Sequence, residues 1–213
     1  DRLGSHPPHP ARSRQAEWQT RAGALDLLLP AQAGKLWDLK PPPADAIEPY
    51  KALARWVKRW PHPDKAPQGV IVRGPSGVGK STLVRGAARE VEARHDVCVA
   101  YFRGTKWEAL TASEIRACLP VLQAADLLVY DELGKESMRG NVPGWLMELF
   151  SERSDNKRPT LFTMNHNDQG LEERWVVAMQ HAHFTEDQAR VDVPPLISRV
   201  YGGTFLLEFN GRD

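Results

Sequence analysis

Short runs of consecutive apolar residues alternate along this chain with longer stretches in which apolar residues recur every three or four positions. The continuous runs predict five buried strands, at residues 69–72, 97–102, 127–130, 160–164 and 204–209. The helical spacing predicts helices at residues 49–60, 83–91, 145–150 and 171–179, and one near 115–122 that Pro120 breaks. Strands that are apolar throughout and alternate with helices are typical of a parallel sheet covered on both faces. The pattern therefore predicts an α/β fold.

The N-terminal part of the chain lacks such a pattern. Residues 1–20 contain three prolines, three arginines and two histidines with little apolar periodicity, which predicts a flexible or poorly ordered leader. Residues 41–43 are consecutive prolines, a stiff stretch that we expect to end where a helix begins. We therefore divide the chain into a flexible or partner-binding segment, 1–33, and a folded domain, 34–213.

Composition and charge narrow the choice of function. A length of 213 residues suits one domain, and 28 basic against 27 acidic side chains give a net charge of only +1, so a DNA-binding surface must be a local patch. Cys98 and Cys118 provide neither a disulfide framework nor a metal-binding cluster. Because the chain contains no apolar run of about 20 residues, we predict a cytoplasmic protein that does not interact with membranes.

A glycine-rich segment between the first strand and the next helix matches the pattern G-x-x-x-x-G-K-S/T. It comprises Gly74, Pro75, Ser76, Gly77, Val78, Gly79, Lys80 and Ser81, followed by Thr82. Glycines allow backbone N–H groups to turn toward an anion, and the helix N-terminus adds partial positive charge. Lys80 can bind the outer phosphates and Ser81 can ligate Mg²⁺. The segment predicts a site for ATP and Mg²⁺; a glycine-rich turn without a ligand is the weaker interpretation.

The third strand ends in two carboxylates, Asp131, which is 51 residues after Lys80, and the adjacent Glu132. A parallel strand delivers such residues to the carboxyl edge of the sheet, where ligands of open α/β folds bind. Asp131 is then placed to hold Mg²⁺, directly or through water, and Glu132 to orient and deprotonate the attacking water. The alternative is an acidic turn that merely ends a strand. A preceding phosphate-binding loop favours hydrolysis.

Two further polar residues complete the predicted catalytic set. Asn165 ends the fourth strand and could position water near the γ-phosphate, with a capping or turn role as the competing interpretation. Arg199 precedes the last strand and could stabilise transition-state charge at the nucleotide of a neighbouring subunit, as an arginine finger does. Arg174 is the rival candidate for this role, and Arg153 and Arg158 could line a subunit interface.

The order of these motifs carries a family resemblance. The shared elements are Asp131-Glu132-Leu133-Gly134, then Arg153, then Lys157-Arg158-Pro159-Thr160 leading to Asn165, and finally Ser198-Arg199. Together they resemble the AAA+ ATPases of the initiator clade, most closely the DnaC-type replicative helicase loaders and the related IstB-type transposition ATPases. The resemblance implies a P-loop AAA+ core, with a five-stranded parallel sheet between helices and no C-terminal helical lid. It also implies ATP hydrolysis by Glu132, Asn165 and Arg199.

The resemblance implies partners as well: a replicative DNA helicase, single-stranded DNA, and other copies of the chain in a ring or helical filament. The basic residues nearest to the expected DNA channel are Lys106, Arg116, Lys135 and Arg139, although taken singly each is better interpreted as solvated surface charge. Three alternatives stay open. They are a transposition helper that binds duplex DNA and a transposase, a nucleotide-gated adaptor with little turnover, and, more weakly, a small-molecule kinase.

Overall fold

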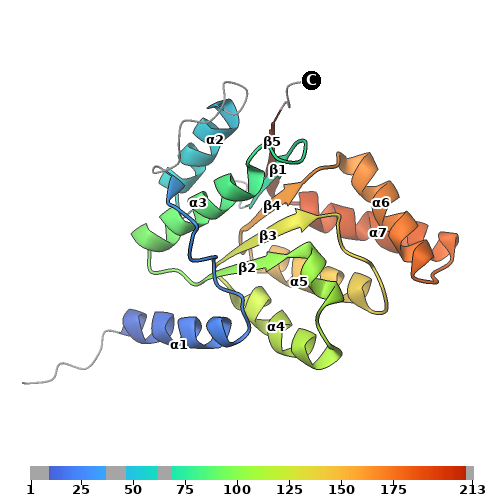
Figure 1. Ribbon diagram of the computed structural model, residues 1–213, viewed down its shortest axis with the longest axis horizontal. Coiled ribbons are helices and arrows are strands. Elements are labelled where there is room, and N and C mark those ends of the chain that lie inside the picture. The colour runs from blue at the N-terminus through green and yellow to red at the C-terminus, as the bar shows by residue number, and fades with distance from the viewer. Residues whose placement is uncertain (1–9, 37–46, 62–68, 210–213) are drawn as a thin grey trace, which may run out of the picture.

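The computed structural model describes residues 10–36, 47–61 and 69–209. Five parallel strands form one sheet in the order β2-β3-β4-β1-β5 (Figure 1). The strands are β1 (Gly69–Arg73), β2 (Val99–Arg103), β3 (Leu127–Leu133), β4 (Thr160–Met164) and β5 (Thr204–Glu208). The predicted α/β class and the five predicted strands are confirmed, with small differences at the strand ends. No helix in the described ranges is long and apolar enough to cross a bilayer.

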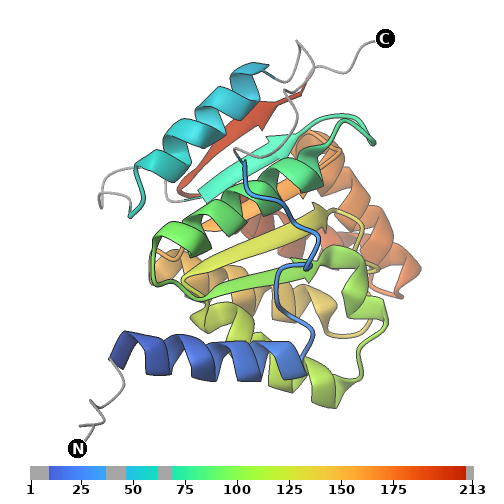
Figure 2. The ribbon, with the colours of Figure 1, turned by 60° about the vertical axis from the view of Figure 1, so that its left-hand side comes forward.

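Helices cover both faces of this sheet (Figures 1 and 2). The helices of the described residues are α1 (Pro10–Ala24), α2 (Ile47–Lys58), α3 (Lys80–Arg94), α4 (Ala112–Ala124), α5 (Val142–Asp155), α6 (Asp168–His181) and α7 (Glu186–Tyr201), with a 3₁₀ helix η3 (Gly104–Glu108). Alternate strand residues face opposite layers: Val70 and Val72 pack with α2 and α3, whereas Ile71 packs with the helices of the other face. Two hydrophobic cores result, one on each side of the sheet.

The prediction of a flexible leader is wrong for residues 10–20, which belong to helix α1. In this helix the indole Nε1 of the buried Trp18 donates a hydrogen bond to the Val99 carbonyl group at 3.1 Å. Further along, the Tyr101 backbone N–H donates to the Leu27 carbonyl group at 2.7 Å. Both contacts lie on the open side of the edge strand β2, along which α1 runs (Figure 2). The segment thus satisfies backbone groups that an edge strand leaves unpaired.

Residues 10–36 therefore pack on the same domain as the sheet. Leu36 and Leu29 join the core beneath α2 and α3, so no break in packing marks the predicted boundary between residues 33 and 34. A partner-binding role for the segment stays a prediction. Residues 1–9 of the predicted leader and the proline run 41–43 lie outside the described residues.

Helix α4 also differs from the prediction, because it continues through Pro120. Thr111 and Glu114 form a capping box that begins the helix. Leu119 and Val121 are buried on either side of the proline, and the proline itself is exposed. A carbonyl group that the proline leaves without a helical partner can bond water at such a position, and burial of the two neighbours keeps the helix in place.

Candidate active site

The glycine-rich segment forms an open loop between β1 and α3, at the carboxyl edge of the sheet. Gly77 and Gly79 have φ angles of 84° and 92°, and a Cβ atom added to either would meet no atom within 4 Å. Glycine is thus required at both positions by backbone conformation and not by crowding. Helix α3 begins at Lys80, and no side chain caps its N-terminus. Its first N–H groups, with the loop, are arranged to receive an anion.

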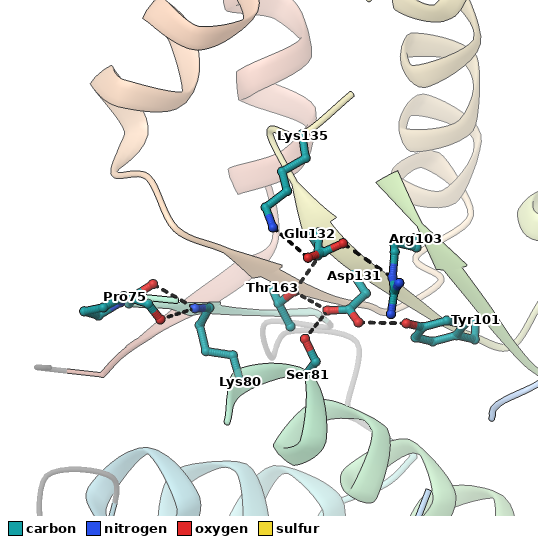
Figure 3. A network of polar contacts seen from close by, with 10 residues as sticks. Pro75, Lys80, Ser81, Tyr101, Arg103, Asp131, Glu132, Lys135 and Thr163 are labelled. Carbon is teal, nitrogen blue, oxygen red and sulfur yellow. Dashed lines mark hydrogen bonds and ion pairs between the residues drawn. The ribbon is translucent and has the colours of Figure 1, made fainter. Parts of the chain in front are cut away.

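Lys80 folds back onto the loop that precedes it (Figure 3). Its side-chain Nζ donates hydrogen bonds to the carbonyl groups of Gly74, at 2.8 Å, and Pro75, at 2.6 Å. The residue is 7% exposed, and burial, followed by the positive charge of Lys135, lowers the pKa of its ammonium group. Two carbonyl oxygens thus accept hydrogen bonds from this nitrogen, and phosphate oxygens can replace them.

Asp131 is completely buried at the end of β3 and accepts hydrogen bonds from three hydroxyl groups (Figure 3). Its Oδ1 accepts from Ser81 Oγ at 2.6 Å and from Thr163 Oγ1 at 2.5 Å, and its Oδ2 accepts from Tyr101 OH at 2.8 Å. Burial, with the Asp131 charge as the second cause, raises the pKa of Tyr101 to about 12, which keeps its hydroxyl a donor. Because carboxylate and hydroxyl oxygens are ligands that Mg²⁺ prefers, the adjacent Ser81 and Asp131 fit this ion.

Glu132 occupies a strained position beside Asp131. Its φ is 65°, in the left-handed region, where the register between β3 and β4 shifts. Its backbone N–H donates to Thr163 Oγ1 at 2.8 Å, so Thr163 contacts both acidic residues. The carboxylate is paired with Lys135 Nζ at 2.7 Å and, more loosely, with Arg103 Nε at 3.4 Å. The side chain is thereby fixed at the edge of the loop.

These groups surround a pocket of about 260 Å³. Its lining comprises Ser76, Gly77, Gly79, Lys80, Ser81, Thr82, Glu132, Leu133, Lys135, Thr163, Asn165 and His166. The structure therefore brings together the predicted loop, Glu132 and Asn165. The cap of helix α6 is Asn167, two residues beyond Asn165, and its side chain accepts from the Gly170 N–H at 2.7 Å. The capping role considered for Asn165 therefore belongs to Asn167. Burial, then Arg174 and Lys135, lowers the pKa of His166.

Sequence reasoning missed Thr163 and Tyr101, which hold Asp131 from the two strands flanking β3. The signal for Thr163 was available, since it is a hydroxyl residue near the end of a strand whose other residues after Thr160 are apolar. Tyr101 carries no comparable signal, because an aromatic residue within a strand is ordinarily a packing residue.

No protein-family model and no curated protein matches the chain, but several solved structures are similar to it. The structure of DnaI is similar with a TM-score of 0.66 and 23% identity, over 84% of this chain and 89% of that one. The DnaC helicase loader is similar with a TM-score of 0.57 and 16% identity, over 84% of this chain and 98% of that one. The chain has the P-loop AAA+ fold. At this identity the likeness establishes the fold alone.

A third similar structure is a replication initiator, DnaA, bound to AMPPCP and single-stranded DNA. It matches with a TM-score of 0.61 and 16% identity over 87% of this chain. This chain spans about half of the DnaA chain, 52%. The predicted resemblance to DnaC-type proteins is thus supported at the level of the AAA+ fold.

Arg199 lies at the opposite edge of the sheet from the phosphate loop of its own chain. It belongs to the last turn of α7, just before β5, and lines a second pocket of about 220 Å³ with Gly69, Thr160 and Thr204. Those three residues begin strands, so this pocket lies at the amino edge of the sheet, opposite the phosphate loop. The Arg199 side chain is 46% exposed, with Nη1 4.0 Å from Asp155 Oδ1. It can therefore meet a nucleotide only on another molecule.

The rival Arg174 lies at the other edge. Its Nε donates at 3.1 Å to the carbonyl group of Gly134, in the turn that follows Glu132. Arg174 thus contacts the active-site turn of its own chain, which favours Arg199 over it for a role between subunits.

Arg153 has a different role from the interface role predicted for it, because it is completely buried. It donates hydrogen bonds to the carbonyl groups of Leu122, Gln123, Ala125 and Pro159 and to the Thr160 hydroxyl group. Burial, followed by the charge of Arg158, lowers the pKa of Arg153 to about 9, which leaves it charged at neutral pH. Arg153 therefore joins the end of α4 to the start of β4, and the interface prediction is wrong for this residue.

The basic residues considered for DNA are only partly available. Lys106 is paired with Asp26, at 2.9 Å, and Lys135 is paired with Glu132. Arg116 and Arg139 are exposed. A DNA contact through either lysine would require its present ion pair to open.

Proposed function

We propose that this chain is an ATPase that loads a replicative DNA helicase onto single-stranded DNA. One observation carries the ATPase part: Lys80 and Ser81 of the phosphate loop line one pocket with Glu132, and Ser81 donates a hydrogen bond to the buried Asp131. A loop alone would serve nucleotide storage, whereas a carboxylate beside it supplies the base that hydrolysis requires.

Each side chain has a proposed role in this reaction. Lys80 exchanges the carbonyl groups of its own loop for phosphate oxygens, and Ser81 and Asp131 hold Mg²⁺, which when bound neutralises phosphate charge. Glu132 takes the proton of the attacking water as that oxygen bonds to the γ-phosphorus and the bond to ADP breaks. Asn165 orients this water, and Arg199 of one subunit stabilises the developing charge in the pocket of the next.

The loader part rests on likeness and is the finer proposal. The similar structures include DnaI and a DnaC helicase loader, each covered by this chain over nearly its whole length. The ordered motifs from Asp131 to Arg199 support the same assignment. Single-stranded DNA and assembly into a ring or filament follow as proposed interactions, and the exposed Arg199 supports assembly.

Two measurements test this proposal. ATP turnover of the purified chain should rise when single-stranded DNA is added, because assembly on DNA would bring Arg199 to a neighbouring pocket. The replicative helicase from the same cells should co-purify with the chain, in an ATP-dependent manner, and a transposase should not. Capture of the transposase alone would replace the loader by a transposition helper, and absence of turnover under every condition would leave an adaptor.

A further inference from the structure

A buried carboxylate that has no role assigned above lies four residues beyond Glu132. Glu136 is 1% exposed, and its two oxygens accept three hydrogen bonds. Oε1 accepts from Tyr130 OH at 2.8 Å, and Oε2 accepts from the Gly134 backbone N–H at 2.8 Å and from Trp175 Nε1 at 2.9 Å. All three donors are uncharged. A buried carboxylate without a cation costs stability, so stability alone does not account for it.

The hydrogen bonds around Glu136 form one connected and fully satisfied chain. Trp107 Nε1 donates to Tyr130 OH at 2.8 Å, which leaves the tyrosine proton free to point at Glu136 Oε1. The network thus reaches β3 through Tyr130, the active-site turn through Gly134, α6 through Trp175 and η3 through Trp107. Three segments distant in sequence, β3 with the turn that follows it, α6 and η3, are thus connected through a single carboxylate. Burial raises the pKa of Glu136, and the hydrogen bonds to its carboxylate, that of Trp175 first, oppose this effect.

The turn that these bonds hold is the one that carries Glu132. Glu132 and Gly134 both have left-handed φ angles, 65° and 90°. A non-glycine residue keeps such a conformation only where its surroundings impose it. The bond from the Gly134 N–H to Glu136 closes the turn directly after Glu132, and the adjacent Thr163 contact holds the other side.

The start of η3 lies against both Glu136 and the backbone of Glu132. A Cβ atom on Gly104 would lie 2.6 Å from Glu136 Oε1 and 2.9 Å from the Glu132 carbonyl oxygen. At such distances the neighbouring atoms would have to move, and one of the two is a backbone atom of Glu132, the proposed base. Any movement of η3 against β3 must therefore reach both residues.

We infer that Glu136 is a positioning residue for the proposed base: its carboxylate fixes the turn that carries Glu132 and couples that turn to α6 and η3. This inference rests on the proposed ATPase function. It assigns Glu136 no contact with nucleotide, since Glu136 does not line the pocket. A displacement of η3 or α6, for example by a macromolecule bound to that surface, changes the placement of Glu132 and hence the rate of hydrolysis.

Two variants perturb the Glu136 contacts in different ways. Glu136→Gln keeps the shape but places an amide N–H₂ where only donors converge, so at least one donor loses its acceptor. Gly104→Ala keeps every hydrogen-bonding group and pushes the carboxylate instead. Both should lower kcat at saturating ATP at least about tenfold, because misplacing a catalytic group by about 1 Å can cost about 100-fold. The Kd for ATP, measured in each variant, should change less than about twofold, since the phosphate loop is untouched.

A control and a second readout separate positioning from loss of fold. Leu119→Ala removes buried side-chain atoms from α4, in the same core, and should lower the melting temperature while kcat stays near that of the parent. The indole N–H signal of Trp175, identified with Trp175→Phe, should shift in Gly104→Ala, which alters nothing on α6. Normal kcat in both variants of an active parent, or an unmoved Trp175 signal in Gly104→Ala, would overturn the inference. An inactive parent would instead refute the proposed function.

Discussion

The lysine of the phosphate loop offers the sharpest single perturbation. We predict that Lys80→Ala weakens ATP binding about 100-fold and leaves the domain folded. The ammonium group now donates to two carbonyl groups, and we expect two phosphate oxygens to replace them. Hydrogen bonds to charged groups contribute about 1.5–3 kcal/mol each. Lys80 must break two hydrogen bonds to its own loop before it binds phosphate, so we take the lower value, about 1.5 kcal/mol, for each new bond. The variant should therefore lose about 3 kcal/mol of ATP-binding free energy, which is about 100-fold in Kd.

The stability of the nucleotide-free variant should change little. Pro75 is exposed and Gly74 is half-buried, so water can solvate the two carbonyl groups that lose their donor. We expect a loss of about 1 kcal/mol in the free energy of unfolding, small against the roughly 5–15 kcal/mol typical of domains. Loss of ATP binding would then reflect the missing contact and not an unfolded chain.

Calorimetric titration and thermal unfolding measure both quantities. With ATP at 100 times the parent Kd, ligand binding should stabilise the parent by about 2.7 kcal/mol and the variant by about 0.4 kcal/mol. Lys106→Ala is the matched control, because Lys106 also donates to two carbonyl groups, those of Leu25 and Asp26, but does not line the pocket. An ATP affinity of Lys80→Ala within about threefold of the parent would refute the assignment of the loop.

Three further outcomes are expected. Arg199→Ala should bind ATP like the parent and hydrolyse it poorly, and mixing it with Lys80→Ala should restore phosphate release; a mixture that co-assembles on DNA yet stays inactive would make Arg174 the next candidate. Tyr101→Phe should weaken Mn²⁺ binding, followed by electron paramagnetic resonance, about two- to tenfold, since Asp131 loses one neutral hydrogen bond; unchanged affinity would remove Tyr101 from the metal site. Arg153→Met should lower the free energy of unfolding in urea by about 3–5 kcal/mol because several buried carbonyl groups lose their donor, and a loss below about 1 kcal/mol would contradict that role.

The sheet and the phosphate loop could be predicted because each has a local signal. A strand of consecutive apolar residues, such as 127–130, needs helices on both faces of its sheet. The spacing of Gly74, Gly79 and Lys80 by itself predicts a phosphate-binding loop. Glu132 and Asn165 followed from their places at the ends of strands, since parallel strands end at one edge. These residues do line one pocket in the structure.

Features that depend on distant contacts could not be predicted in the same way. Helix α1 packs through few residues, chiefly Trp18 and Ala22, so its sequence shows little periodicity. Glu136 resembles any surface glutamate until Trp175 and Tyr130 are seen to donate to it. Arg153 similarly looked like an interface charge, because its acceptors lie on α4 and on the segment before β4. In each case tertiary contacts decide the environment, and no local pattern reports them.

The role of Glu132 as the base is tested by comparing phosphate release by the parent and by Glu132→Gln, with saturating ATP, Mg²⁺ and single-stranded DNA. The amide keeps the shape of the side chain but cannot accept the proton of water. We predict that the variant binds ATP as tightly as the parent and releases phosphate at least about 100-fold more slowly. Equal rates in the two proteins, with ATP bound to both, would place the base elsewhere and refute hydrolysis by Glu132.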